Sequence, residues 1–190
     1  MTSVAIAGRV LPRNAAVSAT LVIIAAALTA LAAQWRIPLP FTPVPITGQT
    51  FAVLLTGAAL GFRLGAAGQI LYLAVGIAGA PVFTDGASGF EVIRGATGGY
   101  LVGFVFAAGL IGWMAERRQD RSFATMFTAF CIGSAVIYTF GVIGLVTSAG
   151  MGLSDAIAGG VVPFVFGDVL KAAAAGLILP SAWKLVGDRG

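Results

Sequence analysis

Two oppositely charged residues stand inside a long apolar stretch near the end of the chain. Asp168 and Lys171 lie three residues apart within segment 161–186, so on a helix they share one face. A charge at membrane depth costs at least about 2.5–3.5 kcal/mol on insertion scales, and ionisable groups there usually serve a function. The pair therefore indicates a site for a polar ligand group or a relay for ions or protons, with a structural ion pair as the alternative.

Uncharged polar side chains extend this candidate site. Gln49 and Tyr100 each begin an apolar segment at the same level as Asp168, and for both of them ligand binding and interhelical hydrogen bonding remain equally open. For Gln69 and Tyr138 the sequence favours hydrogen bonding between helices, or anchoring of the tyrosine at the membrane interface.

The residue types needed for catalysis or metal binding are scarce. The chain has no histidine and a single cysteine, Cys131, which excludes an intrachain disulfide and a cysteine metal cluster. No predicted membrane segment contains a pair of carboxylates. We therefore expect neither an enzyme nor a metalloprotein, and no cofactor.

The elements that position these residues belong to a membrane protein. Of the 190 residues, 58% are hydrophobic and only 9% are charged, and the mean hydropathy is +0.99. A soluble fold cannot cover itself with so few charges, since about a quarter of the residues in average soluble domains are charged. The net charge of +4 is better explained by cytoplasmic loops than by nucleic-acid binding.

Charges, prolines and glycine clusters divide the chain into six apolar segments. The sequence predicts an all-α integral membrane protein, a compact six-transmembrane-helix bundle that forms a single domain over 1–190. The second and third segments are separated only by Arg63, which leaves a tight hairpin or one broken helix open, and the charge distribution favours the hairpin. The predicted spans are 14–34, 48–62, 64–79, 96–115, 123–149 and 161–186.

The basic residues orient this bundle. If the chain begins inside the cell, eight basic residues fall in inner segments and two in outer segments, a clear positive-inside bias. We expect both the N- and C-termini to be cytoplasmic. The inner residues are Arg9, Arg13, Arg63, Arg117, Arg118, Arg121, Lys184 and Arg189, and the outer residues are Arg36 and Arg94.

Two outer loops are unusual in composition. Segment 35–47 contains four prolines and is too apolar for a solvated loop, so it is expected to run extended and to cover the protein as a lid. Segment 80–94 carries Phe83 and Arg94. Both loops are expected on the same side of the membrane as Asp168 and Lys171. A polar pocket beneath apolar loops suits a small molecule with a polar head and an apolar body.

Small residues recur at a spacing of four. This spacing lets helix backbones approach closely, so we interpret the two glycine series mainly as internal helix packing, with a docking surface for another membrane protein as the alternative. The series are Gly57, Gly61 and Gly65, then Gly95, Gly99 and Gly103, and in the first span Ala15 with Ala19 and Ala26 with Ala30.

Four stretches, taken together and in order, carry a family resemblance. They are PFTPVPITGQTFAVLLTGAALG at 40–61, GQILYLAVGIAGAPVF at 68–83, GATGGYLVGF at 95–104 and PFVFGDVLKAA at 163–173. With them the chain resembles the BioY family, the biotin-specific S components of energy-coupling factor (ECF) vitamin transporters. One departure is Ala96, where the family commonly has proline.

The resemblance implies biotin capture from outside by a six-helix protein of the bacterial inner membrane. It also implies a transmembrane coupling protein and two ABC-type ATPases as partners. The chain contains no Walker A motif, so we expect no ATP site in it. Whether it also works alone, as a self-sufficient secondary transporter, stays open.

Biotin offers two ureido N–H donors, a ureido carbonyl and a carboxylate. We expect Asp168 to accept from the N–H groups, Lys171 to donate to the carbonyl and Arg94 to bind the carboxylate, with Lys171 on the carboxylate as the open alternative. Gln49, Tyr100 and Phe83 complete the predicted biotin site. By the same resemblance, Ala15, Ala19, Ala26 and Ala30 are expected to contact the coupling protein.

Overall fold

A computed structural model of the chain describes residues 5–12 and 14–187. Arg13 and Arg189, two of the basic residues used for orientation, lie outside the described residues. The helices are α1 (Ile6–Val10), α2 (Ala15–Gln34), α3 (Gln49–Leu60), α4 (Phe62–Ile77), α5 (Phe90–Arg94), α6 (Gly98–Ala115), α7 (Phe123–Thr147), α8 (Leu153–Gly160) and α9 (Val162–Val186). A 3₁₀ turn, η1 (Thr84–Gly86), and a two-stranded antiparallel ribbon of β1 (Arg36–Ile37) and β2 (Ile46–Thr47) complete the list.

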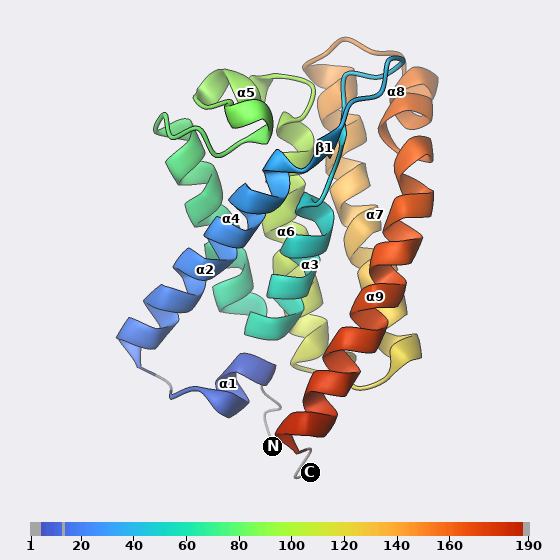
Figure 1. Cartoon of the computed structure of the whole chain (residues 1–190). Coiled ribbons are helices and arrows are strands. Elements are labelled where there is room, and N and C mark those ends of the chain that lie inside the picture. The colour runs from blue at the N-terminus through green and yellow to red at the C-terminus, as the bar shows by residue number, and fades with distance from the viewer. Residues whose placement is uncertain (1–4, 13, 188–190) are drawn as a thin grey trace.

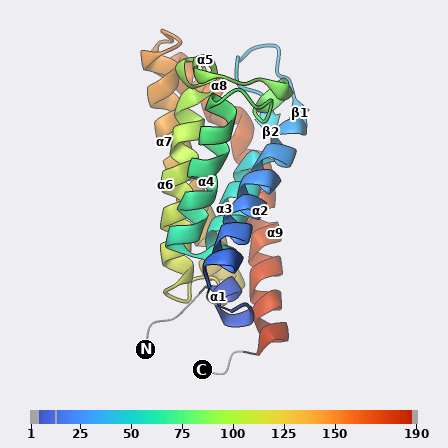
Figure 2. The same ribbon diagram turned by 90° about the vertical axis from the view of Figure 1, so that its left-hand side faces the viewer.

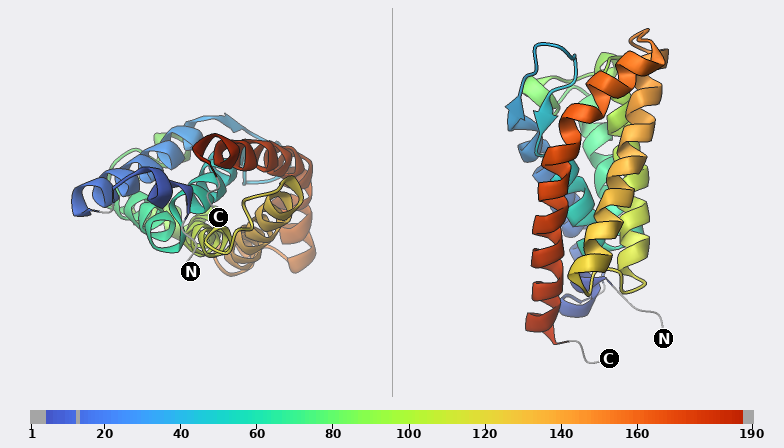
Figure 3. Two further views of the ribbon diagram at one scale, coloured as in Figure 1. Left: turned by 90° about the horizontal axis from the view of Figure 1, so that it is seen from below. Right: turned by 90° about the vertical axis from the view of Figure 1, so that its right-hand side faces the viewer.

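The long helices run side by side as a bundle. Helices α2, α3, α4, α6, α7 and α9 follow the long axis, and α2 packs on α3 and α4 (Figures 1 and 2). The β ribbon, α5 and α8 lie at one end. Helix α1 and the end of α9 lie at the other end (Figure 3).

The helix lengths match the sequence prediction in part. Four segments are long and apolar enough to cross a membrane, namely α2, α6, α7 and the stretch Leu153–Val186. Helices α3 and α4 are also apolar but have only 12 and 16 residues. At 1.5 Å per residue α3 measures about 18 Å, well short of the roughly 30 Å of a bilayer core. Segment 48–62 is therefore not a full-length span.

The junction between α3 and α4 is a hairpin, as the charge distribution predicted. Gly61 turns the chain with a φ of 85°, a left-handed conformation that glycine adopts without steric cost. The two helices then approach so closely that a Cβ at Gly65 would collide with Gly57.

The glycine spacing mostly serves packing within the bundle. Gly57 faces Ala108 of α6, and Gly99 and Gly103 face α7. Any side chain at these glycines would push the helices apart. Internal packing is therefore confirmed for them, whereas Gly95 lies in the loop after α5.

Apolar side chains cover the outside of the bundle. Large aliphatic and aromatic residues are exposed along α2 and α9, including Leu31, Phe166 and Leu177. Water would penalise such a surface, whereas lipid matches it. The arrangement therefore agrees with the membrane location expected from composition.

A buried polar cluster ties the α6–α7 loop to α9. The indole of Trp183 donates a hydrogen bond to Asp120, and the Arg121 guanidinium lies over the Trp183 ring. Asp120 is fully buried. Burial raises the pKa of Asp120 above its usual value, and the Trp183 hydrogen bond and the Arg121 charge only partly oppose that rise.

Candidate functional site

A cavity of about 270 Å³ opens at the end of the bundle that carries the β ribbon. The proline-rich segment 38–45 forms part of its wall, as the lid prediction expected. The other walls come from the start of α3 and from η1, α5, α6, α7 and α9. Segments far apart in the sequence therefore meet around one space.

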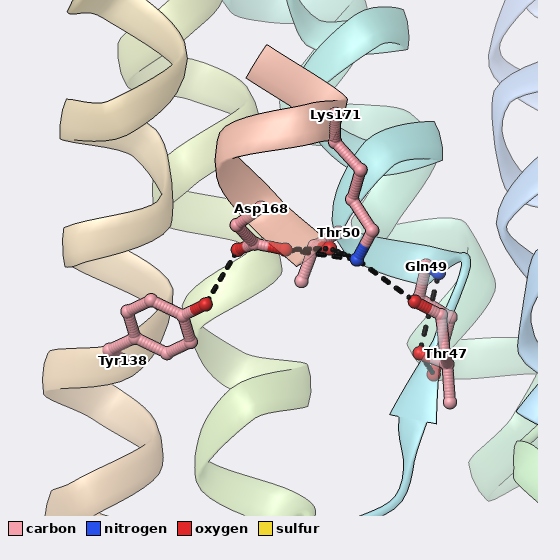
Figure 4. Close-up of polar contacts among 6 residues, drawn as sticks. All are labelled: Thr47, Gln49, Thr50, Tyr138, Asp168 and Lys171. Carbon is pink, nitrogen blue, oxygen red and sulfur yellow. Dashed lines mark hydrogen bonds and ion pairs between the residues drawn. The ribbon is translucent and has the colours of Figure 1, made fainter. Parts of the chain in front are cut away.

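The charged pair of α9 stands in the wall of this cavity. Lys171 Nζ lies 2.9 Å from Asp168 Oδ1, and Asp168 is only 6% exposed. The Tyr138 hydroxyl of α7 donates to Asp168 Oδ2 at 2.7 Å, and the Thr50 hydroxyl donates to Oδ1 at 3.2 Å. Figure 4 shows this network bridging α7, α9 and the start of α3.

Some hydrogen-bond positions of the network are unused and can bind a ligand. Lys171 Nζ donates to Asp168 Oδ1, to the Thr50 hydroxyl at 2.7 Å and to the Thr47 carbonyl at 3.1 Å, which uses all three ammonium donors. The Asp168 carboxylate accepts three bonds and has about four acceptor positions. One position on Oδ2 therefore remains, together with the acceptor lone pairs of the Tyr138 hydroxyl.

The short α3 explains how a backbone carbonyl reaches Lys171. The chain enters the bundle as β2 and becomes helical only at Gln49, so Thr47 lies just before the first turn. Non-helical backbone at membrane depth is tolerated where it lines a cavity, and both Thr47 and Thr50 line this one.

Gln49 lines the cavity but is held by the protein itself. Its amide nitrogen donates to the Tyr72 hydroxyl at 2.9 Å, and its oxygen accepts from the Thr47 and Thr84 hydroxyls. Tyr72 in turn donates to the Val82 carbonyl. Gln49 thus fastens the outer loop to α3 and α4.

Two aromatic side chains form apolar wall. Phe83 is 1% exposed and packs edge-on against Tyr72 at 5.4 Å between centroids. The Tyr100 hydroxyl donates to the Gly160 carbonyl of α8 at 2.7 Å, so its ring is fixed beside the cavity. The structure brings both predicted residues to the site.

Arg94 is not brought to the cavity. It ends the short α5, its side chain is 67% exposed, and it pairs with Glu91 at 3.7 Å. Its guanidinium also lies over the Phe90 ring. The arginine that lines the cavity is Arg36 of β1, which forms an ion pair with Asp85 of η1.

The four alanines of α2 face different surroundings. Ala15 and Ala19 are exposed, whereas Ala26 is buried and Ala30 is partly buried. Ala26 belongs to the apolar core, and Ala30 packs against it. Ala15 and Ala19 are therefore the more accessible pair.

Five of the residues that line the cavity were not assigned to the binding site from the sequence. Tyr138 was assigned to interhelical hydrogen bonding, and its bond does join two helices, but the acceptor is the carboxylate of the cavity. The proline-rich motif that ends in Thr47 was the available signal for Thr47 and Thr50. No pattern singled out the remaining two, Arg36 and Asp85. Gln69 pairs with Thr29 of α2, away from the cavity, as interhelical bonding predicts.

Comparison with known proteins decides the family. The model of the BioY family matches residues 6–188 of the chain. The chain belongs to the BioY family. Within the described residues, no cluster of three or more metal-ligating side chains occurs.

Relatives and a solved structure extend this finding. The chain is 37% identical over 161 residues to a biotin transporter BioY of Rhizobium etli, covering 81% of this chain and 86% of the relative. It is 37% identical over 153 residues to that of Thermotoga maritima, covering 80% and 89%. The crystal structure of the S component for biotin from an ECF-type ABC transporter superposes with a TM-score of 0.81 at 26% identity, covering 92% of this chain and 95% of that one.

Proposed function

We propose that the protein captures biotin from outside the cell and mediates its uptake as the membrane subunit of a transporter, without enzymatic activity. One observation carries this proposal beyond family membership. The cavity contains a buried carboxylate, Asp168, with a neighbouring hydroxyl of Tyr138 at 2.7 Å. Two adjacent acceptors suit a ligand with two adjacent N–H donors.

The ureido ring of biotin has this pattern. One N–H donates to the remaining position on Asp168 Oδ2 and the other to the Tyr138 oxygen. The ureido carbonyl then takes one donor of Lys171 in exchange for the Thr47 carbonyl, which is the longest of its three contacts at 3.1 Å. The apolar thiophane ring packs on Phe83 and Tyr100. Gln49 holds the neighbour of Phe83, Thr84, and the Gly160 carbonyl of α8 holds Tyr100.

Six apolar segments cross the inner membrane in this proposal, with both termini in the cytoplasm. The second crossing combines the short α3 with the extended backbone of β2 that precedes it. Support comes from the position of α1 and the C-terminal end of α9, which lie at the same end of the bundle (Figure 3). The basic residues Arg63, Arg117 and Arg118 lie at that end too. The cavity then faces outward. A transmembrane coupling protein and two ABC-type ATPases energise uptake, and the exposed Ala15 and Ala19 of α2 contact the coupling protein.

Calorimetry on the purified protein tests the proposal. Biotin should bind one-to-one without ATP, whereas riboflavin, thiamine and pantothenate should not bind. The Asp168→Asn variant replaces a charged acceptor with an amide and should weaken biotin at least about tenfold. A folded sample that binds no biotin, or an Asp168→Asn variant with unchanged affinity, would reject the assignment. Biotin uptake by vesicles containing only this chain would show that the coupling proteins are dispensable.

A further inference from the structure

A second charged pair stands at the rim of the cavity, away from α9. Arg36 of β1 and Asp85 of η1 form an ion pair between the two outer loops, and both residues line the cavity. Their side chains are 39% and 52% exposed. The pair therefore lies where the cavity meets the outside.

The cations near the cavity differ in the donors they can offer. Lys171 already donates three bonds within the protein. Arg94 pairs with Glu91 and stacks on Phe90, outside the cavity wall. Arg36 contacts Asp85 through Nε. Its two terminal nitrogens make no hydrogen bond to any other described residue, and a guanidinium has five donors in all.

The β ribbon connects Arg36 to the polar network. Arg36 stands directly opposite Thr47 in the register of the ribbon, and the Thr47 carbonyl accepts from Lys171. Residues opposite each other in an antiparallel pair lie about 4.5–5.5 Å apart at Cα. A ligand whose polar head binds at Asp168 and Lys171 can therefore extend its other end toward Arg36 past the apolar wall of Val44 and Phe83.

Asp85 is placed so that another carboxylate can replace it. It is half exposed, so turning it into water leaves no buried charge behind. It sits in the left-handed region with φ 64°, in a turn of three residues. An ion pair at such exposure is weak. Asp85 contacts Arg36 through Nε, so a ligand carboxylate that binds two guanidinium donors side by side makes the stronger contact.

We propose that Arg36 binds the carboxylate of the ligand, and that this carboxylate takes the place of Asp85. The inference rests on the proposed function and names the residue that selects the free acid. Exchange of one carboxylate for the other also releases the contact between β1 and η1, which couples occupancy of the cavity to the arrangement of the two outer loops.

The test compares biotin with its uncharged methyl ester in a set of variants, by calorimetry on folded, detergent-purified protein. The wild-type protein should prefer the acid by about tenfold or more. The Arg36→Gln variant should lose this preference, while its affinity for the ester stays within twofold. Arg36→Lys, which keeps the charge but not the planar fork, should retain part of it. The matched control Arg63→Gln removes the same charge at the opposite end of the bundle and should behave as wild type.

The Asp85→Asn variant tests whether the ligand carboxylate replaces Asp85, or whether the Arg36–Asp85 pair only holds the two outer loops together. Removing the competing charge should strengthen acid binding about 1.5- to 5-fold, the range of a surface ion pair, and leave the ester unchanged. Equal weakening of both ligands would overturn the exchange.

Two further results bear on Arg36 itself. An unchanged acid preference in Arg36→Gln, or its loss in Arg94→Gln, would overturn the assignment to Arg36 while leaving biotin binding established. A folded wild-type protein that binds neither ligand would overturn the proposed function and this inference with it.

Discussion

The three tyrosines of the chain allow one hydroxyl to be tested against two internal references. Tyr72 and Tyr100 are buried and Tyr138 is partly buried. Each hydroxyl donates to a different acceptor, namely the Val82 carbonyl for Tyr72, the Gly160 carbonyl for Tyr100 and the Asp168 carboxylate for Tyr138. A Tyr→Phe change removes the same atom in all three. We expect only Tyr138→Phe to act mainly on biotin affinity.

The magnitude follows from the partners. In the proposed complex the Tyr138 oxygen accepts a ureido N–H while its hydrogen stays on Asp168. Its removal leaves that N–H unpaired in a buried site, which costs about 1–3 kcal/mol. This corresponds to roughly a 5- to 150-fold loss of affinity. Tyr72→Phe and Tyr100→Phe remove neutral hydrogen bonds worth about 0.5–1.5 kcal/mol each, and this loss falls on folding stability.

Calorimetry and thermal unfolding, run on the same samples, separate the two effects. Tyr138→Phe should shift the biotin dissociation constant far more than either reference variant. The references should lower Tm with less than about a fivefold change in affinity. If Tyr138→Phe binds biotin as wild type does, or if Tyr72→Phe weakens binding more, the assignment of the ureido acceptors is wrong.

Three other predictions address the wall, the inner end and the partner face. Gly76→Ala should lower Tm and weaken biotin, because a Cβ there collides with the Phe83 ring and overpacking costs about 1–3 kcal/mol; wild-type values would contradict this. Because burial raises the pKa of Asp120, its ionisation destabilises the fold. As pH falls from 7 toward 4, wild type should therefore gain Tm relative to Asp120→Asn, and parallel curves would refute the cause. Ala19→Trp should block uptake in cells containing the coupling proteins but spare biotin binding, whereas normal uptake would exclude this contact face.

The sequence predicted those parts of the site whose residue types differ sharply from their neighbours in the chain. Asp168 and Lys171 are the charged residues in the middle of a long apolar helix, so their position alone marked them. Their spacing of three predicted the contact that the structure shows at 2.9 Å. The four prolines of 38–45 predicted an apolar lid in the same way, and this segment lines the cavity.

Tyr138 could not be assigned because α7 has no readable polar face. The helix is apolar on all sides, with glycines, alanines and phenylalanines around its circumference, so periodicity does not reveal which face points inward. Only the packing of α7 on α6 and α9 decides that Tyr138 meets Asp168.

The choice between Arg36 and Arg94 illustrates a second limit. Both arginines adjoin outer loops, and composition offers no reason to prefer one. The difference arises from short elements that depend on tertiary contacts, the β ribbon that turns Arg36 toward Asp85 and the five-residue α5 that ends in Arg94. Helices and strands of this length have little stability of their own, so the sequence did not predict them.

The truncated α3 links these local features to the binding site. If the helix began several residues earlier, the Thr47 carbonyl would accept a hydrogen bond within the helix. Lys171 would then lack one of its three acceptors. Arg36 would also have no strand partner at Thr47. The 12-residue length of α3 is too short for a membrane span but places extended backbone beside Asp168. The short α3, which departs from six equal spans, therefore assembles the polar wall of the cavity. Replacing Pro45 and Gly48 with alanine should lengthen α3. Biotin binding should then be abolished even in a protein that still inserts and folds.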